Sequence, residues 1–132
     1  MPILFTVNKD KGYFIARYVG TITEEDVLRE NALFLSSGEW HPGLNALIDL
    51  READLSAAQN SVIKRVAQYF ETVLRANHAN SVKTAIYAPA DFPYAIARIY
   101  EVMAEQSPQT VQVYREISEA KTWIENHVES SE

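Results

Sequence analysis

The order of apolar and polar positions along the chain predicts strands that alternate with helices. Two segments near the N-terminus alternate apolar and polar side chains, and a turn that ends at Gly12 joins them into a hairpin. Further along, short apolar runs indicate strands whose two faces are both covered, as in a parallel sheet. The predicted strands are residues 3–7, 13–19, 44–50, 82–88 and 110–115.

Four helices are predicted between and after these strands, each opened by a polar residue that we interpret as an N-cap. The side chain of an N-cap accepts hydrogen bonds from first-turn N–H groups that have no partner within the helix. Asp26 stands three residues after Thr23, and Gln59 three after Ser56, which is the spacing of a capping box. The predicted caps are Thr23, Ser56, Asp91 and Ser118.

Two of the predicted helices carry distinctive faces. The helix after Ser56 has two adjacent apolar stripes, so we expect it to be largely buried. In the helix after Asp91, apolar residues recur at helical spacing and share one face, which leaves Tyr94 and Arg98 on the opposite, solvent-facing side. That apolar face consists of Phe92, Ile96, Ile99 and Met103.

The resulting order, ββαβαβαβα, predicts an α/β fold with a single domain over residues 1–132. Strands that alternate with helices form a mostly parallel sheet, to which the hairpin adds an antiparallel N-terminal strand. Ligands of such sheets bind beyond the carboxyl ends of the strands. In this chain we expect that edge to gather Asp49, Arg51, Tyr87, Asp91 and Arg115.

Composition narrows the classes of function. The formal net charge of −6 argues against nucleic acid as a partner, because proteins that bind it usually present a basic face. The chain has no cysteine, and no GxSxG, Walker A or GxGxxG motif occurs in it. Three histidines share no metal-ligand spacing, so we expect neither a metal nor another cofactor. These histidines are His41, His78 and His127.

The apolar runs of the chain are all too short for a membrane span. None approaches the roughly 20 residues of a spanning helix. The residues from Met1 to Leu4 lack the basic and apolar regions of a signal peptide. We therefore expect no integral membrane association and a cytoplasmic location.

The polar residues near the predicted sheet edge have both a structural and a functional interpretation. Asp49 and Asp54 are a candidate acid–base pair, but nothing nearby supplies a nucleophile, and closing a strand explains Asp49 better. As a cap, Asp91 would already occupy the N–H groups that otherwise hold an anion. The predicted helix start at Ser56 is more open to an anion, and Arg51 is close to it in sequence.

Aromatic residues give a second kind of candidate. Phe92 and Tyr94, together with Trp40 and His41, are expected to form an exposed patch that suits a protein partner or an apolar ligand better than catalysis. Tyr94 and Arg98 are four residues apart and are interpreted as a stacked pair. The candidate binding residues are Asp49, Arg51, Ser56, Tyr87, Asp91, Phe92, Tyr94 and Arg98.

Four segments of the chain resemble the SpoIIAA-like, or STAS, class of small bacterial regulatory domains. The resemblance implies a β-α superhelix with helices packed on the sheet, and a non-enzymatic role in protein interaction or small-ligand sensing. The matching segments are GTITEED at 20–26, ALIDLR at 46–51, AIYAPADFPYAIAR at 85–98 and VYREISEAKTWI at 113–124.

One departure from this class concerns phosphorylation. Anti-sigma-factor antagonists of the class carry a phosphorylatable serine in a D-S-S-G-like segment after the strand that corresponds to residues 44–50. Here residues 49–59 read DLREADLSAAQ, and Ser56 offers the only hydroxyl. The chain is more similar to the uncharacterised branch that is sometimes grouped with lipid-binding Sec14-like domains.

The sequence therefore favours a non-enzymatic regulatory or binding module whose partner is a protein or a small apolar or anionic ligand. The alternative is a small enzyme with its site around Asp49, Arg51 and Asp91 at the carboxyl edge of the sheet. A third interpretation is a switch that works through phosphorylation of Ser56. The sequence also leaves a homodimer open.

Overall fold

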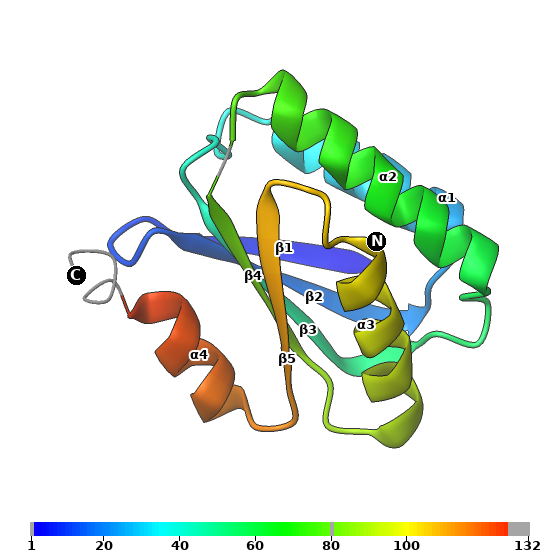
Figure 1. Ribbon diagram of the computed structural model, residues 1–132. Helices are drawn as coiled ribbons and strands as arrows, with labels where there is room; N and C mark the ends of the chain where they lie inside the picture. Colours follow the sequence, from blue (N-terminus) through cyan, green and yellow to red (C-terminus); the bar gives the residue numbers. More distant parts are fainter. Residues whose placement is uncertain (1, 80, 127–132) are drawn as a thin grey trace.

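In the computed structural model, which describes residues 2–79 and 81–126, five strands and four helices follow one another in the predicted order ββαβαβαβα (Figure 1). His127, predicted on the last helix, lies outside the described residues. The elements are β1 (Ile3–Asn8), β2 (Tyr13–Thr21), α1 (Glu24–Leu35), β3 (Asn45–Asp54), α2 (Asn60–Ala76), β4 (Val82–Tyr87), α3 (Asp91–Met103), β5 (Gln109–Tyr114) and α4 (Ile117–Glu125).

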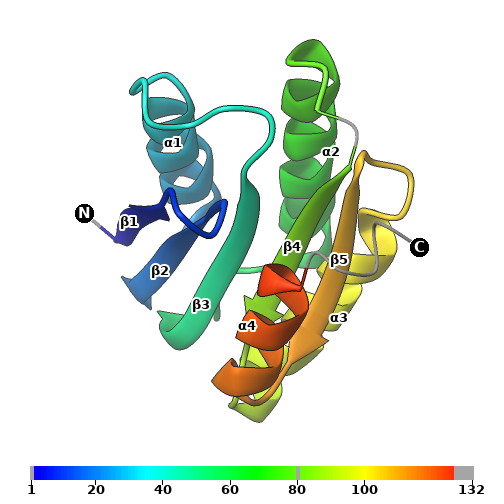
Figure 2. The same cartoon turned by 90° about the vertical axis from the view of Figure 1, so that its left-hand side faces the viewer.

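The strands form one sheet in the order β1-β2-β3-β4-β5. β1 runs antiparallel to β2, and the other three neighbouring pairs are parallel, which confirms the predicted arrangement. Helices α1, α2 and α3 lie over one face of the sheet and α4 over the other (Figures 1 and 2). The hairpin between β1 and β2 closes through Gly12, whose φ of 75° favours glycine.

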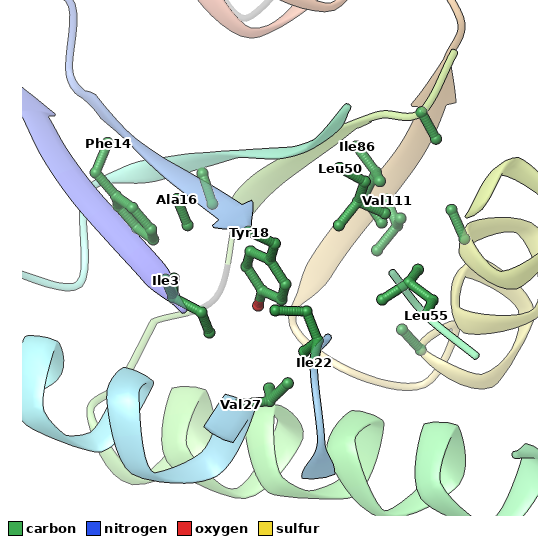
Figure 3. Packing of buried hydrophobic residues seen from close by; sticks show 14 of the residues in the cluster. Ile3, Phe14, Ala16, Tyr18, Ile22, Val27, Leu50, Leu55, Ile86 and Val111 are labelled. Atoms are coloured by element: carbon green, nitrogen blue, oxygen red, sulfur yellow. The ribbon is translucent and has the colours of Figure 1, made fainter. Parts of the chain in front are cut away.

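The two faces of the sheet bury different side chains, because successive residues of a strand point to opposite faces. On β2, Phe14 and Tyr18 belong to the core beneath α1–α3, whereas Tyr13 packs with residues of α4. Figure 3 shows the larger of these cores, into which Phe14 and Tyr18 project. The rings of Phe14 and Phe34 lie 4.8 Å apart, so α1 is anchored over the N-terminal strands.

The third strand is longer than predicted, and the second helix begins later. β3 continues past Leu50 to Asp54, because it keeps pairing with β2 beyond an irregularity in register. α2 begins at Asn60, so the prediction that Ser56 caps this helix is wrong. The Ser56 N–H instead donates to Oδ1 of Asp54 at 3.0 Å, in a turn that leads out of the strand.

Only one of the four predicted caps is observed. Thr23 and Asp26 form the predicted capping box. The Thr23 N–H donates to the Asp26 carboxylate at 3.0 Å, and the Asp26 N–H donates to the Thr23 hydroxyl at 3.1 Å. The N-cap position of α3 is Ala90, whose extended backbone places Asp91 inside the first turn. Similarly, α4 begins after Glu116, so Ser118 lies within the helix. The predictions of caps at Asp91 and Ser118 are therefore wrong.

The inward face of α3 also differs from the predicted one. Ala97 is buried on the sheet, and Tyr94 packs against the core rather than facing solvent. Phe92, predicted on the buried face, is 54% exposed. Tyr94 and Tyr100, three residues before and after the buried Ala97, share its helix face and pack against the core.

Helix α2 is less buried than its two apolar stripes predicted. Ile63, Ala67 and Leu74 are buried, but Val62 and Val66 are only partly so. Both of these valines line a cavity beneath the helix.

Candidate functional site

A cavity of about 160 Å³ lies between the sheet and helices α1, α2 and α3. β3 contributes Ile48 and Leu50 to its lining, α2 contributes Val66, and α3 contributes Ile96. For comparison, an engineered apolar cavity of about 150 Å³ in another protein binds benzene or xenon. The volume therefore suits a compact apolar molecule.

Helix α2 covers this cavity and is tied to its neighbours by polar contacts. At its first half, Arg65 donates to both carboxylate oxygens of Glu24 on α1, at 2.6 and 2.8 Å. At its last turn, Arg75 donates to the carbonyl of Gln106, which follows α3, at 2.6 Å. Arg65 and Arg75 are both exposed, so these hydrogen bonds lie at the protein surface. They connect α2 to the helices on either side of it.

Three polar side chains from three elements form a chain of hydrogen bonds at the cavity. The Thr84 hydroxyl of β4 donates to Oε1 of Gln109 on β5 at 2.8 Å, and Nε2 of Gln109 donates to the Tyr100 hydroxyl of α3 at 2.9 Å. The ring of Tyr100 is partly exposed, but its hydroxyl end is buried. All three residues line the cavity.

A second tyrosine, Tyr18 of β2, lines the cavity from beneath α1. Its hydroxyl points away from the sheet toward the helices (Figure 3) and interacts with the side chain of Asn31. Burial raises the pKa of Tyr18 to about 12, and burial likewise raises the pKa of Tyr100. Both hydroxyls therefore keep their protons near neutral pH and do not act as bases.

The lining of the cavity carries little charge. Among the described residues that line it, there is no lysine, arginine or histidine, and Glu24 is the only carboxylate. The hydrogen bond from Arg65 holds the pKa of Glu24 below its usual range. An anion in the cavity would thus meet a carboxylate at the rim and no cation inside.

The sequence-predicted residues lie in two other places. Tyr87 ends β4, and its register partner Asp49 lies midway along β3, two residues before Arg51. The interpretation of Asp49 as the residue that closes a strand is therefore wrong, because β3 continues to pair with β2 as far as Asp54. The buried Asp49 carboxylate accepts from the backbone N–H of Arg51 at 3.0 Å and from its guanidinium at 3.4 Å. The Arg51 guanidinium lies 5.9 Å from the centre of the Tyr87 ring.

The second group surrounds the start of α3. Arg115 donates to Oδ1 of Asp91 at 2.8 Å, and its guanidinium lies 4.2 Å from the centre of the Tyr94 ring. Arg98 and Tyr94 are in contact as predicted, with the guanidinium 6.0 Å from the centre of the ring and a hydrogen bond of 3.3 Å to the hydroxyl, but it is Arg115 that lies closer to the ring. The exposed Phe92 lies one residue after Asp91.

These two groups remain separate in the part of the chain that the structure describes. No hydrogen bond or ion pair of the described residues joins Asp49 or Arg51 to Asp91, which is paired with Arg115 instead. Ser56 is hydrogen-bonded to Asp54 and belongs to neither group. The roles that the sequence predicts for these residues remain predictions.

Sequence reasoning missed the cavity and its polar residues. Tyr100 is not among the predicted residues, and its spacing from Ala97 and Ala104, three and four residues away on the same helix face, is the signal that could have indicated an inward hydroxyl. Thr84 and Gln109 are single polar residues in apolar strands. Their hydrogen bond joins residues that are 25 positions apart, so only the fold reveals the pair.

Two further classes of site are not seen in the described ranges. Residues 2–79 and 81–126 contain no cluster of three or more His, Asp or Glu side chains that could hold a metal ion. Within the same ranges, none of the helices combines the length and the apolar character needed to cross a bilayer.

Comparisons with known proteins bear on the fold. No family model matches the sequence, and no curated protein matches it. Among solved structures, the chain is similar to an uncharacterized protein of the DUF3478 family with a SpoIIAA-like fold from Shewanella loihica PV-4. The two share 21% sequence identity with a TM-score of 0.59, over 92% of this chain and 91% of the other. This chain therefore has the SpoIIAA-like fold that its sequence resemblance implies.

Proposed function

We propose that this protein is a non-enzymatic, cytoplasmic binding module that holds a small apolar molecule in the cavity between its sheet and helices α1–α3. The cavity of about 160 Å³ carries the proposal, because its lining is apolar and it lies beneath a helix with partly exposed valines. Burial of the apolar surface of a ligand there is favourable in proportion to the area removed from water.

The chemistry of the cavity favours binding over catalysis. Catalysis of acyl or proton transfer requires a nucleophile or a base with a suitable pKa. Apart from the Glu24 carboxylate, which is paired with Arg65, the polar side chains of the lining are mainly hydroxyls and amides, and the raised pKa of Tyr18 keeps its hydroxyl neutral. These groups can orient a ligand through hydrogen bonds without reacting with it.

Ethylbenzene can serve as the probe for this function. A ligand that binds only the folded state raises its melting temperature as the ligand concentration rises above Kd. We expect ethylbenzene to raise the Tm of the wild-type protein. Val66→Phe, which fills the cavity from α2, should abolish the shift, and Val62→Phe is a second filling variant for the case in which the first does not fold.

The matched control is Val102→Phe. Val102 is 62% exposed on α3 and does not line the cavity, so the same substitution there should leave the ethylbenzene shift intact. The proposal fails if ethylbenzene does not shift the wild-type Tm, or if the filling variants respond as strongly as the control.

A second candidate function is the binding of a protein partner at the start of α3. Its support is the exposed Phe92 next to the contacts that Arg115 makes with Asp91 and Tyr94, since aromatic and arginine side chains dominate many protein interfaces. Cross-linking in the native cell tests it. We expect Phe92→Ala to lose a cross-linked protein that Val102→Ala retains, and equal cross-linking by both would rule the surface out.

A further inference from the structure

We infer that the cavity selects a compact, uncharged molecule with one hydrogen-bond-accepting oxygen, and that the Tyr100 hydroxyl donates to this oxygen. The inference rests on the proposed function and specifies its ligand. It combines three observations: the direction of the hydrogen bonds around Tyr100, the charge of the lining and the volume of the cavity.

The chain of hydrogen bonds from Thr84 through Gln109 to Tyr100 does not use the hydrogen of the Tyr100 hydroxyl. Thr84 donates to Gln109, and Gln109 donates to Tyr100, so the Tyr100 oxygen acts as an acceptor in this chain. Among the described residues, none of the hydrogen bonds is donated by the Tyr100 hydroxyl, which leaves its hydrogen available to a ligand. A buried hydroxyl hydrogen without an acceptor is unfavourable, and a carbonyl oxygen of a ligand would satisfy it.

The charge of the lining excludes an anionic ligand. A carboxylate taken out of water must be paired and hydrogen-bonded to compensate its desolvation. None of the described lining residues is a cation, and the one carboxylate, on Glu24, is of the same sign as such a ligand. A ketone, an ester or an amide presents an acceptor oxygen without carrying this charge.

The volume limits the size of the molecule. About 160 Å³ is close to the size of a cavity that accepts benzene, so a single ring with a short substituent fits without displacement of α2. Acetophenone, ethylbenzene and benzoate are three such molecules of nearly the same shape. They differ in the feature under test, because only the first combines neutrality with an acceptor oxygen.

Isothermal titration calorimetry with these three probes tests the inference. In the wild-type protein we expect acetophenone to bind about three- to tenfold more tightly than ethylbenzene, the worth of one net hydrogen bond. Tyr100→Phe should remove this preference while keeping the affinity for ethylbenzene, which also shows that the variant is folded. Tyr94→Phe is the control, since its hydroxyl bonds Arg98 outside the cavity. Benzoate should not bind any of the three proteins measurably at pH 7.

Several results would overturn the inference. Equal affinity for acetophenone and ethylbenzene in the wild-type protein would show that no donor is available. A preference that survives in Tyr100→Phe but disappears in Thr84→Val would assign the donor to Thr84 instead. Benzoate bound as tightly as acetophenone would contradict the exclusion of anions. If none of the probes binds, the proposed function itself fails, whereas binding of ethylbenzene alone preserves the proposed function and rejects this ligand class.

Discussion

Arg65 of α2 donates to both carboxylate oxygens of Glu24 on α1, at 2.6 and 2.8 Å, and Glu24 lies on the rim of the apolar cavity. Such two-point pairs between guanidinium and carboxylate fix orientation as well as distance. The pair therefore positions the first half of α2 over the cavity. Because both side chains are near the surface, solvent weakens its contribution to the overall stability.

The first prediction concerns the ion pair between Arg65 and Glu24. Arg65→Gln should change the melting temperature little, because the pair is exposed, but it should speed hydrogen exchange of amides in the first half of α2. Native-state hydrogen exchange measures this directly. Arg98→Gln is the control, since Arg98 pairs with Glu101 on its own helix. Equal exchange rates in the two variants would show that the ion pair does not hold α2 in place.

A second prediction concerns the free energy of unfolding at acidic pH. The hydrogen bond from Arg65 lowers the pKa of Glu24 in the folded state. A carboxylate whose folded pKa lies below its unfolded value contributes stability at higher pH and loses it as pH falls through the folded pKa. The stability difference between wild type and Glu24→Gln, measured by urea unfolding, should therefore be present at pH 7 and shrink below about pH 4. A difference independent of pH would contradict this.

The helix caps give a third prediction, in which two hydroxyls that look alike in the sequence behave differently. Thr23→Ala removes an observed capping hydrogen bond and should lower the free energy of unfolding by about 1 kcal/mol. Ser56→Ala keeps the hydrogen bond from its backbone N–H to Asp54 and removes only an exposed contact of the hydroxyl with the same carboxylate. It should therefore change the free energy of unfolding by less than about 0.5 kcal/mol. Urea denaturation of both variants measures the two changes in the free energy of unfolding. A larger decrease for Ser56→Ala than for Thr23→Ala would mean that Ser56 caps α2 and that the helix begins there.

A fourth prediction follows from the buried tyrosine on β2. Burial raises the pKa of Tyr18 to about 12, above its usual value near 10. The folded state thus keeps a proton that the unfolded state loses, so stability should fall as pH rises from about 10 to 12. Urea unfolding should show a shallower fall in Tyr18→Phe than in the wild type, with Tyr94→Phe as the control. The same slope in all three proteins would place Tyr18 in contact with water.

The sequence predicts the fold well because local patterns determine most of it. Alternating side chains in residues 3–7 and 13–19 specify the hairpin, and the Thr23–Asp26 pair specifies the start of α1. Both signals lie within a few residues of one another. The parallel order of the remaining strands then follows from the helices between them.

The errors arise where distant parts of the chain meet. The extension of β3 to Asp54 depends on pairing with β2, about 30 residues earlier in the sequence. Asp91 lies inside the first turn of α3 and pairs with Arg115 rather than capping its own helix. Neither partner is visible from the residues that surround it in sequence, and Ser, Thr and Asp near a helix start are common whether or not they cap.

The candidate site was least accessible from the sequence. Polar residues predicted at the carboxyl edge of the sheet divide into two groups, around Arg51 and around Arg115. The cavity depends on the distance between α2 and the sheet, which the hydrophobic pattern of α2 does not encode. The pattern of apolar stripes indicates that a face is sheltered from water, but it does not reveal whether protein or a ligand covers it.

A crystal structure of the wild-type protein with ethylbenzene tests the central claim most directly. The account predicts electron density for the ring between β3, α2 and α3, in contact with Ile48, Val66 and Ile96, and none at this place in Val66→Phe. Density for ethylbenzene found only at the surface, with side chains filling the space beneath α2, would contradict the account.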